Sequence, residues 1–162
     1  MRVILAAAML VMIAMLPAHA VDNFVSGNWR GGAVLDGAKF VQCNMWAPYT
    51  NNWDLMFAMT ASGDFRLGVR NQKLDMTWSQ LFGQKLGVRM QIDDNPVIIK
   101  AFTATSTTVA STSIANLGWD KALRAGKTLR MHTGKGVRRF PLAGIDPALS
   151  QLSACAAKHR KA

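Results

Sequence analysis

Apolar and polar residues alternate along much of the chain, which is the pattern of strands that bury one face. The segments that we predict to be strands are residues 38–46, 53–59, 65–69, 88–92, 97–103, 128–133 and 137–142. Turn residues at 61–64, 93–96 and 134–136 join the second segment to the third, the fourth to the fifth and the sixth to the last. The threonine-rich stretch up to Ile114 continues the β-branched pattern. The chain therefore reads as a series of antiparallel hairpins.

Two helices are predicted among these strands. Trp119–Ala125 is a short one, and Gly126 should end it as a left-handed residue. Asp146 is a suitable N-cap with Pro147 in the first turn, so a second helix should run from Pro147 toward Lys158. Residues 71–86 are ambiguous, with a short helix as one reading near 79–82. The predicted fold class is mainly β, an antiparallel sandwich or barrel with a short helix and a C-terminal helix.

The first twenty residues have the layout of a secretory signal. Arg2 precedes an apolar run from Val3 to Leu16, and Ala18–Ala20 forms a small-residue cleavage site. The apolar run is shorter than the roughly 20 residues that span a bilayer, although an uncleaved anchor is the alternative. We predict a signal peptide at 1–20 and a single β-rich domain at 21–162 that is periplasmic or secreted, with no transmembrane segment after cleavage.

The predicted mature domain is strongly basic. The full chain has 19 Lys and Arg against 9 acidic residues, so removal of Arg2 leaves 18 against 9 and a net charge of +9. A positive field of this size favours an anionic envelope component or an acidic protein partner, and solubility alone is the competing explanation. The tryptophans do not interleave regularly with the cations, which makes a nucleic-acid partner an unfavoured interpretation.

The chain has two cysteines, Cys43 and Cys155, and in an exported protein they are expected to form one disulfide. Each lies on the apolar side of its predicted element, so both should point inward. The bond would join an early strand to the last helix. Two reduced buried thiols, or a reactive one, are the alternative.

A cluster of basic residues surrounds the last predicted hairpin turn. Lys135, Arg138 and Arg139 lie at the turn and on the strand that follows, and Arg130 and His132 lie on the partner strand. Such a group of cations can hold a phosphate or a sulfate, and we predict an anion-binding site at Arg130, Lys135, Arg138 and Arg139. The structural alternative is an edge strand that carries cations to prevent aggregation.

The candidate motifs for catalysis, metal binding or cofactor binding are all incomplete in this sequence. Ala125–Thr128 lacks the earlier glycine of a phosphate-binding loop and lies between a helix and a strand. Asp93–Asn95 has no further acid at calcium-ligand spacing, so we interpret it as a turn. The sequence has no Gly-x-Ser-x-Gly. We therefore predict no catalytic residue, no metal site, no cofactor and no enzymatic activity.

Three short stretches in the second half carry a family resemblance. They are Leu86–Asp94, Leu123–Leu129 and Phe140–Gly144 with Ala148–Leu149 after it. Over residues 63–152 this succession resembles the invasion-associated locus B family of exported proteins from alphaproteobacteria. The resemblance implies a periplasmic or surface-associated β-sandwich without enzymatic activity, linked in some members to host-cell colonisation. The chain departs from that family in lacking its central cysteines.

The sequence thus predicts an exported, non-enzymatic binding or cell-envelope accessory protein, with the host association implied by the resemblance alone. The alternative is an inhibitor of a hydrolase such as lysozyme or a protease, which would present a rigid exposed loop. The best candidate for that loop is Trp46–Asn52. An enzyme of unfamiliar type is a third class.

Overall fold

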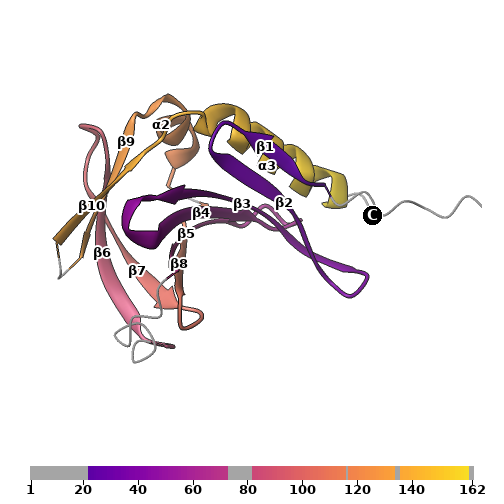
Figure 1. Cartoon of the computed structure of the whole chain (residues 1–162), viewed down its shortest axis with the longest axis horizontal. Helices are drawn as coiled ribbons and strands as arrows, with labels where there is room; N and C mark the ends of the chain where they lie inside the picture. The colour runs from indigo at the N-terminus through magenta and orange to yellow at the C-terminus, as the bar shows by residue number, and fades with distance from the viewer. Residues whose placement is uncertain (1–21, 73–81, 116, 134–135, 161–162) are drawn as a thin grey trace, which may run out of the picture.

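A computed structural model describes residues 22–72, 82–115, 117–133 and 136–160 of the chain. Within these residues ten strands form one sheet, and every pair of neighbouring strands is antiparallel. The strands are β1 (Phe24–Ser26), β2 (Trp29–Asp36), β3 (Lys39–Tyr49), β4 (Trp53–Met59), β5 (Phe65–Asn71), β6 (Lys85–Ile92), β7 (Ile98–Ala104), β8 (Val109–Ser113), β9 (Thr128–Thr133) and β10 (Gly136–Pro141). The predicted class, mainly antiparallel β with two helices, is confirmed (Figure 1).

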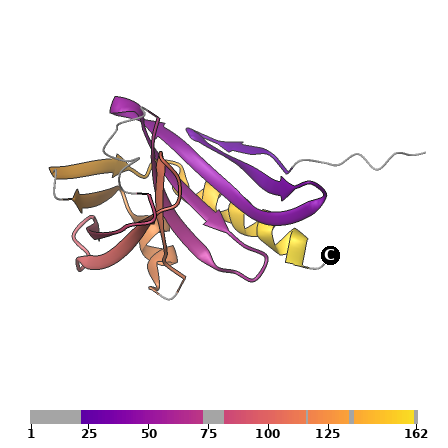
Figure 2. The same ribbon diagram turned by 90° about the horizontal axis from the view of Figure 1, so that it is seen from below.

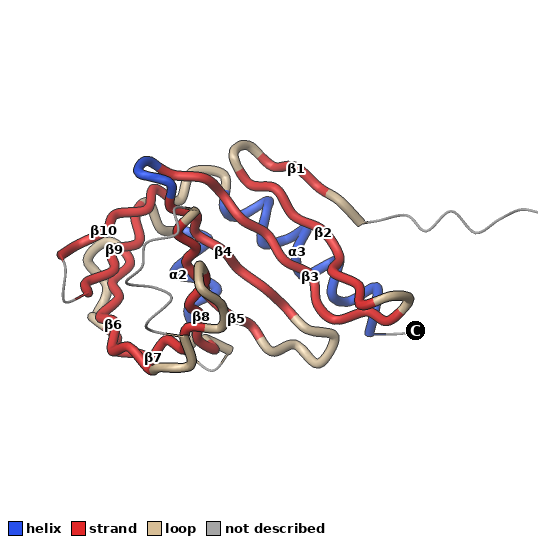
Figure 3. The backbone as a smooth tube through the Cα atoms, turned by 60° about the horizontal axis from the view of Figure 1, so that its bottom comes forward, coloured by secondary structure: helices blue, strands red, loops and turns tan. Residues whose placement is uncertain are grey.

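The order of the strands across the sheet is β1-β2-β3-β4-β5-β8-β7-β6-β9-β10. The sheet is strongly curved, so the strands from β5 to β10 bend round toward the early strands (Figure 3). One face of the sheet, which we call the inner face, carries the core. Its fully buried large side chains include Trp29, Met45, Leu55, Phe57, Leu67, Met90, Ile92, Phe102, Leu129 and Phe140. Because side chains alternate along a strand, the residues between these positions form the outer face.

Helix α3 (Ile145–Arg160) covers the inner face at the β1–β4 side of the sheet (Figure 2). It buries Ile145, Ala148, Leu149, Leu152 and Ala156. This spacing of three and four residues places the apolar side chains on one side of a helix. No helix in the described part of the chain is long and apolar enough to cross a bilayer.

The predicted disulfide is confirmed and joins this helix to the sheet. Cys43 lies on the inner face of β3 and Cys155 lies on the buried side of α3, with Cα atoms 6.1 Å apart. The bond links residues that are 112 positions apart in the sequence. A cross-link of that span removes a large amount of conformational freedom from the unfolded chain.

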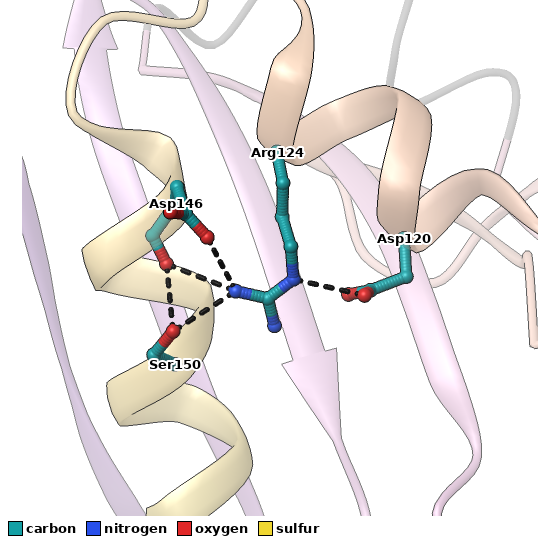
Figure 4. Close-up of polar contacts among 4 residues, drawn as sticks. All are labelled: Asp120, Arg124, Asp146 and Ser150. Atoms are coloured by element: carbon teal, nitrogen blue, oxygen red, sulfur yellow. Dashed lines mark hydrogen bonds and ion pairs between the residues drawn. The ribbon is translucent and has the colours of Figure 1, made fainter.

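A second contact holds the start of α3 against the short helix α2 (Trp119–Ala125). The Nε atom of Arg124 donates to Asp120 at 2.8 Å, and its Nη1 atom donates to the Asp146 carboxylate at 2.7 Å and to the Ser150 hydroxyl at 2.9 Å (Figure 4). Hydrogen bonds to Asp120 and then Asp146 raise the pKa of Arg124 above its already high value. The expectation that Asp146 caps the helix is wrong, because α3 begins at Ile145 and the carboxylate binds Arg124 instead.

The predicted strands and both helices are present, with two differences. The strands β1 and β2 were not predicted, because β2 contains two adjacent glycines and β1 has three residues. The C-terminal helix extends from Ile145 to Arg160, beyond the predicted Pro147 and Lys158. The ambiguous helix near 79–82 falls mainly on residues 73–81, which lie outside the described residues, as does the predicted signal peptide at 1–20.

Gly126 ends α2 as predicted, but its conformation is extended rather than left-handed, with φ −75° and ψ 153°. Close packing explains the glycine. A Cβ atom at this position would lie 2.5 Å from the side chain of Ile92 and 2.7 Å from the carbonyl oxygen of Ala122. The backbone therefore approaches β6 and the helix more closely than any larger residue permits.

We predict that Gly126→Ala lowers the free energy of unfolding by about 1–3 kcal/mol, because the added methyl group overpacks this contact. Gly87→Ala is the matched control, since a Cβ atom there meets nothing within 4 Å. Urea unfolding of the oxidised proteins measures both changes. Equal midpoints for the two variants would show that the close packing at Gly126 is not as described.

Candidate anion-binding face

The outer face of β6, β9 and β10 carries a cluster of cations. The outward-facing cations are Lys85 and Arg89 on β6, Arg130 on β9 and Arg139 on β10, and His132 lies among them. The residues between them on β6 and β9, such as Met90 and Met131, are buried on the inner face. This alternation fixes the direction of the charged side chains. We call this set of five residues the basic face.

The pairing of the strands brings members of the basic face side by side. Arg89 pairs with His132 between β6 and β9, and Arg130 pairs with Arg139 between β9 and β10. Neighbouring strands run about 5 Å apart, and outward positions on one strand are separated by about 7 Å. The Cα atoms of Arg89, Arg130 and Arg139 therefore fall within about 12 Å of one another.

The basic face contains no compensating acid at the outward positions of these strands, as far as the structure describes them. The turn that follows β6 brings two carboxylates, those of Asp93 and Asp94, toward one end of the face. Asp94 lies 4.0 Å from a guanidinium nitrogen of Arg130, and its own side chain is fully exposed. Since an exposed ion pair at that distance is weak, the face keeps most of its positive charge.

Hydrogen bonds to residues at the end of β6 and in the turn after it restrain the side chain of Arg130. Its Nη1 atom donates to the backbone carbonyl of Asp93 at 3.1 Å and lies 3.5 Å from the side-chain oxygen of Gln91. The Asp93 carboxylate accepts hydrogen bonds from the backbone N–H groups of Lys127 and Thr128, both at 2.9 Å. Asp93 thus lies in the predicted turn, and its carboxylate holds the start of β9.

Arg138 lies on the opposite face of β10 from the basic face, so the prediction that it shares a surface with the other cations is wrong. It pairs with the buried residue Met131 and so points to the opposite side of β10 from Arg139. Its guanidinium carbon lies 4.1 Å above the ring of Trp53, a cation–π contact. Lys135, the fourth predicted member, lies outside the described residues.

Arg138 takes part in a contact between β10 and the segment that joins β3 to β4. The Tyr49 hydroxyl donates to the carbonyl of Pro141 at 2.5 Å, and the Tyr49 ring meets Phe140 edge-on at 5.2 Å between centroids. Burial raises the pKa of Tyr49 to about 12, so the hydroxyl stays protonated as a donor. Side chains therefore bring the last strand against the early part of the sheet.

Protection of an edge strand does not account for the whole basic face. Of the three strands that carry the basic face, only β10 lies at an edge of the described sheet, and it contributes Arg139. Arg89 lies on β6, between β7 and β9, and Arg130 lies on β9, between β6 and β10. The pairing of Arg130 with Arg139 places like charges opposite each other, which costs roughly 0.2–1 kcal/mol. A cluster of like charges that costs stability and extends onto the interior strands β6 and β9 favours a binding role.

The other half of the outer face has a different character. Arg30 and Arg70 lie 5.7 and 5.3 Å from the centre of the Trp46 ring, and Arg70 also binds the buried carboxylate of Asp54. A groove of about 330 Å³ lies over Gly68 and is lined by residues of β3, β4, β5 and β8. The polar residues that line it are Gln42, Asn44, Thr60, Arg66, Thr105 and Ser111. These arginines already have protein partners, so this half carries less free positive charge.

The two described histidines lie in separate places. His132 belongs to the basic face, whereas His159 lies 3.0 Å from Asp22 and stacks on Phe40 at 4.1 Å. Asp22 also accepts a hydrogen bond from Lys158. This bond is the main reason that the pKa of Asp22 is lowered; desolvation acts in the opposite direction, and the hydrogen bond with His159 lowers the pKa further. These contacts tie the segment before β1 to the end of α3. Among the described residues, no three His, Cys, Asp or Glu side chains form a group that could hold a metal.

The predicted inhibitory loop Trp46–Asn52 is mostly strand. Trp46 to Tyr49 belong to β3, and the turn that remains is η1 (Thr50–Asn52). Asn51 and Asn52 have positive φ angles of 63° and 61°, which asparagine tolerates better than most residues. The projecting part is thus three residues long, shorter than the loop that the sequence suggested.

The opposite orientations of Arg138 and Arg139 can be tested directly. We predict that Arg138→Ala lowers the free energy of unfolding by about 0.5–1 kcal/mol, because it removes the stacking on Trp53. Arg139→Ala should leave stability unchanged or raise it slightly, because it relieves the like-charge pair with Arg130. Urea unfolding at low salt measures both. A larger loss for Arg139→Ala than for Arg138→Ala would contradict the assignment of faces.

Comparisons with known proteins add no relative: no protein-family model, no curated protein and no solved structure matches this chain. The resemblance to the invasion-associated locus B family therefore stays a prediction.

Proposed function

We propose that this protein is an exported, non-enzymatic accessory domain that binds an anionic component of the cell envelope through its basic face. The observation that carries the proposal is the group Arg89, Arg130 and Arg139, which share one sheet surface with no acid among them. Guanidinium groups bind phosphate and sulfate oxygens through paired hydrogen bonds. A surface with several of them suits a ligand that carries more than one negative charge.

Two further features support export. The first twenty residues have the composition of a secretory signal. The disulfide between Cys43 and Cys155 is of a kind that persists in oxidising compartments and is rare in the cytosol. A periplasmic or secreted location would place the basic face among the phosphorylated and acidic polymers of the envelope.

The rigidity of the basic face also supports binding. Each cation stands on a strand whose intervening side chains are anchored in the core, and Arg130 is held by the turn at Asp93. Such preorganisation reduces the entropy that is lost when the side chains order around a ligand. The long-range positive field of the whole chain would speed the approach of an anionic partner.

A double substitution tests the proposal. Arg89→Gln combined with Arg139→Gln should weaken the affinity of the protein for heparin or lipopolysaccharide about tenfold, because two charge contacts are lost. The double variant should therefore elute at a lower salt concentration. The control is Lys39→Gln combined with Lys121→Gln, which removes the same charge from exposed positions on β3 and α2. Salt-gradient elution measures all three proteins. If the two double variants elute at the same salt concentration, net charge rather than the basic face controls binding.

A further inference from the structure

The basic face also carries exposed apolar side chains in register with its cations. Across four strands, one row of outward residues runs from Ile99 on β7 through Arg89 on β6 and His132 on β9 to Val137 on β10. Ile99 is 68% exposed and Val137 is 49% exposed. Val97, just before β7, is 41% exposed. Aliphatic side chains thus flank the cations on both sides of the face.

This combination discriminates between kinds of anionic partner. A soluble sulfated or phosphorylated polymer offers charge to the arginines but nothing apolar to Ile99 and Val137. A bilayer surface with anionic headgroups offers both, because headgroup phosphates lie directly above the boundary of the acyl chains. Cations near such a surface attract it electrostatically, and apolar side chains beside them add affinity by leaving water.

We propose, resting on the proposed function, that the basic face docks on a phospholipid bilayer that carries anionic headgroups. Arg89, Arg130 and Arg139 contact the headgroup phosphates, and Ile99 and Val137 enter the boundary between headgroups and acyl chains. In this arrangement the outer face of β7, β6, β9 and β10 is the part of the sheet that meets the surface. The disulfide and α3, which cover the inner face, stay in the aqueous phase.

Charge complementarity argues against a second copy of this chain as the occupant. Two copies that met through this face would bring their arginine clusters together, and each full chain has a formal net charge of +10. Like charges in an interface disfavour association. The same charge attracts an anionic membrane, whose surface potential concentrates basic proteins within a Debye length.

Sedimentation with vesicles tests this inference with the whole mature chain. The vesicles contain phosphatidylcholine alone or phosphatidylcholine mixed with phosphatidylglycerol. The test variant is Ile99→Ser combined with Val137→Ser. The control is Leu35→Ser combined with Val41→Ser, since these residues of the β2–β3 hairpin are 43% and 46% exposed and lie outside the basic face.

The wild-type protein should sediment with the vesicles that contain phosphatidylglycerol and not with the vesicles of phosphatidylcholine alone. Ile99→Ser/Val137→Ser should weaken binding to these vesicles about tenfold while heparin retention stays unchanged, because heparin uses only the charges. The control variant should bind vesicles as the wild-type protein does. This pattern would support the apolar contact as well as the charge.

Two results would overturn the inference and leave the proposed function standing. One is retention on heparin or lipopolysaccharide without sedimentation on the anionic phospholipid vesicles. The other is vesicle binding that is the same for the wild-type protein and for Ile99→Ser/Val137→Ser. Absence of binding to heparin, to lipopolysaccharide and to vesicles alike would overturn the proposed function together with the inference.

Discussion

The disulfide between Cys43 and Cys155 is the constraint on which the arrangement of the molecule depends. It joins the inner face of an early strand to the last helix, across 112 positions of the sequence. Helix α3 has buried residues at Ile145, Leu149 and Leu152 that need an apolar surface to cover, and the bond keeps them on the sheet. The contact of Arg124 with Asp146 holds the other end of the same helix. The helix is therefore fixed near both of its ends.

Helix α3 and the basic face lie on opposite faces and toward opposite ends of the sheet. The helix contacts β1 to β4 on the inner face, whereas the cations lie on the outer face of β6, β9 and β10, the strands at the far side of the sheet from α3 in Figure 1. The contact of Tyr49 with Pro141 closes β10 against the early strands, so the basic face stands on a braced part of the sheet. The neighbouring residues Arg138 and Arg139 also lie on opposite faces. Arg138 points inward and stacks on Trp53, whereas Arg139 points outward.

Much of the fold could be predicted from the sequence because its strands alternate clearly, as residues 53–59 and 88–92 do, and because only two cysteines are present. The basic face was predicted only in part. Strict alternation along β10 could have separated Arg138 from Arg139, but the contribution of Arg89 depends on the pairing of β6 with β9, which no local pattern specifies. Asp146 has the local features of an N-cap, and a guanidinium from another helix overrides them. Tertiary contacts decided each of these cases.

Urea unfolding of the protein with its disulfide intact and after reduction measures how much this bond contributes to stability. A cross-link of this span is expected to contribute about 4–5 kcal/mol to the free energy of unfolding. We predict that the reduced protein unfolds at a clearly lower urea concentration, with α3 losing protection from hydrogen exchange first. Coincident unfolding curves for the oxidised and reduced protein would contradict this prediction, because the helix would then be held by packing alone.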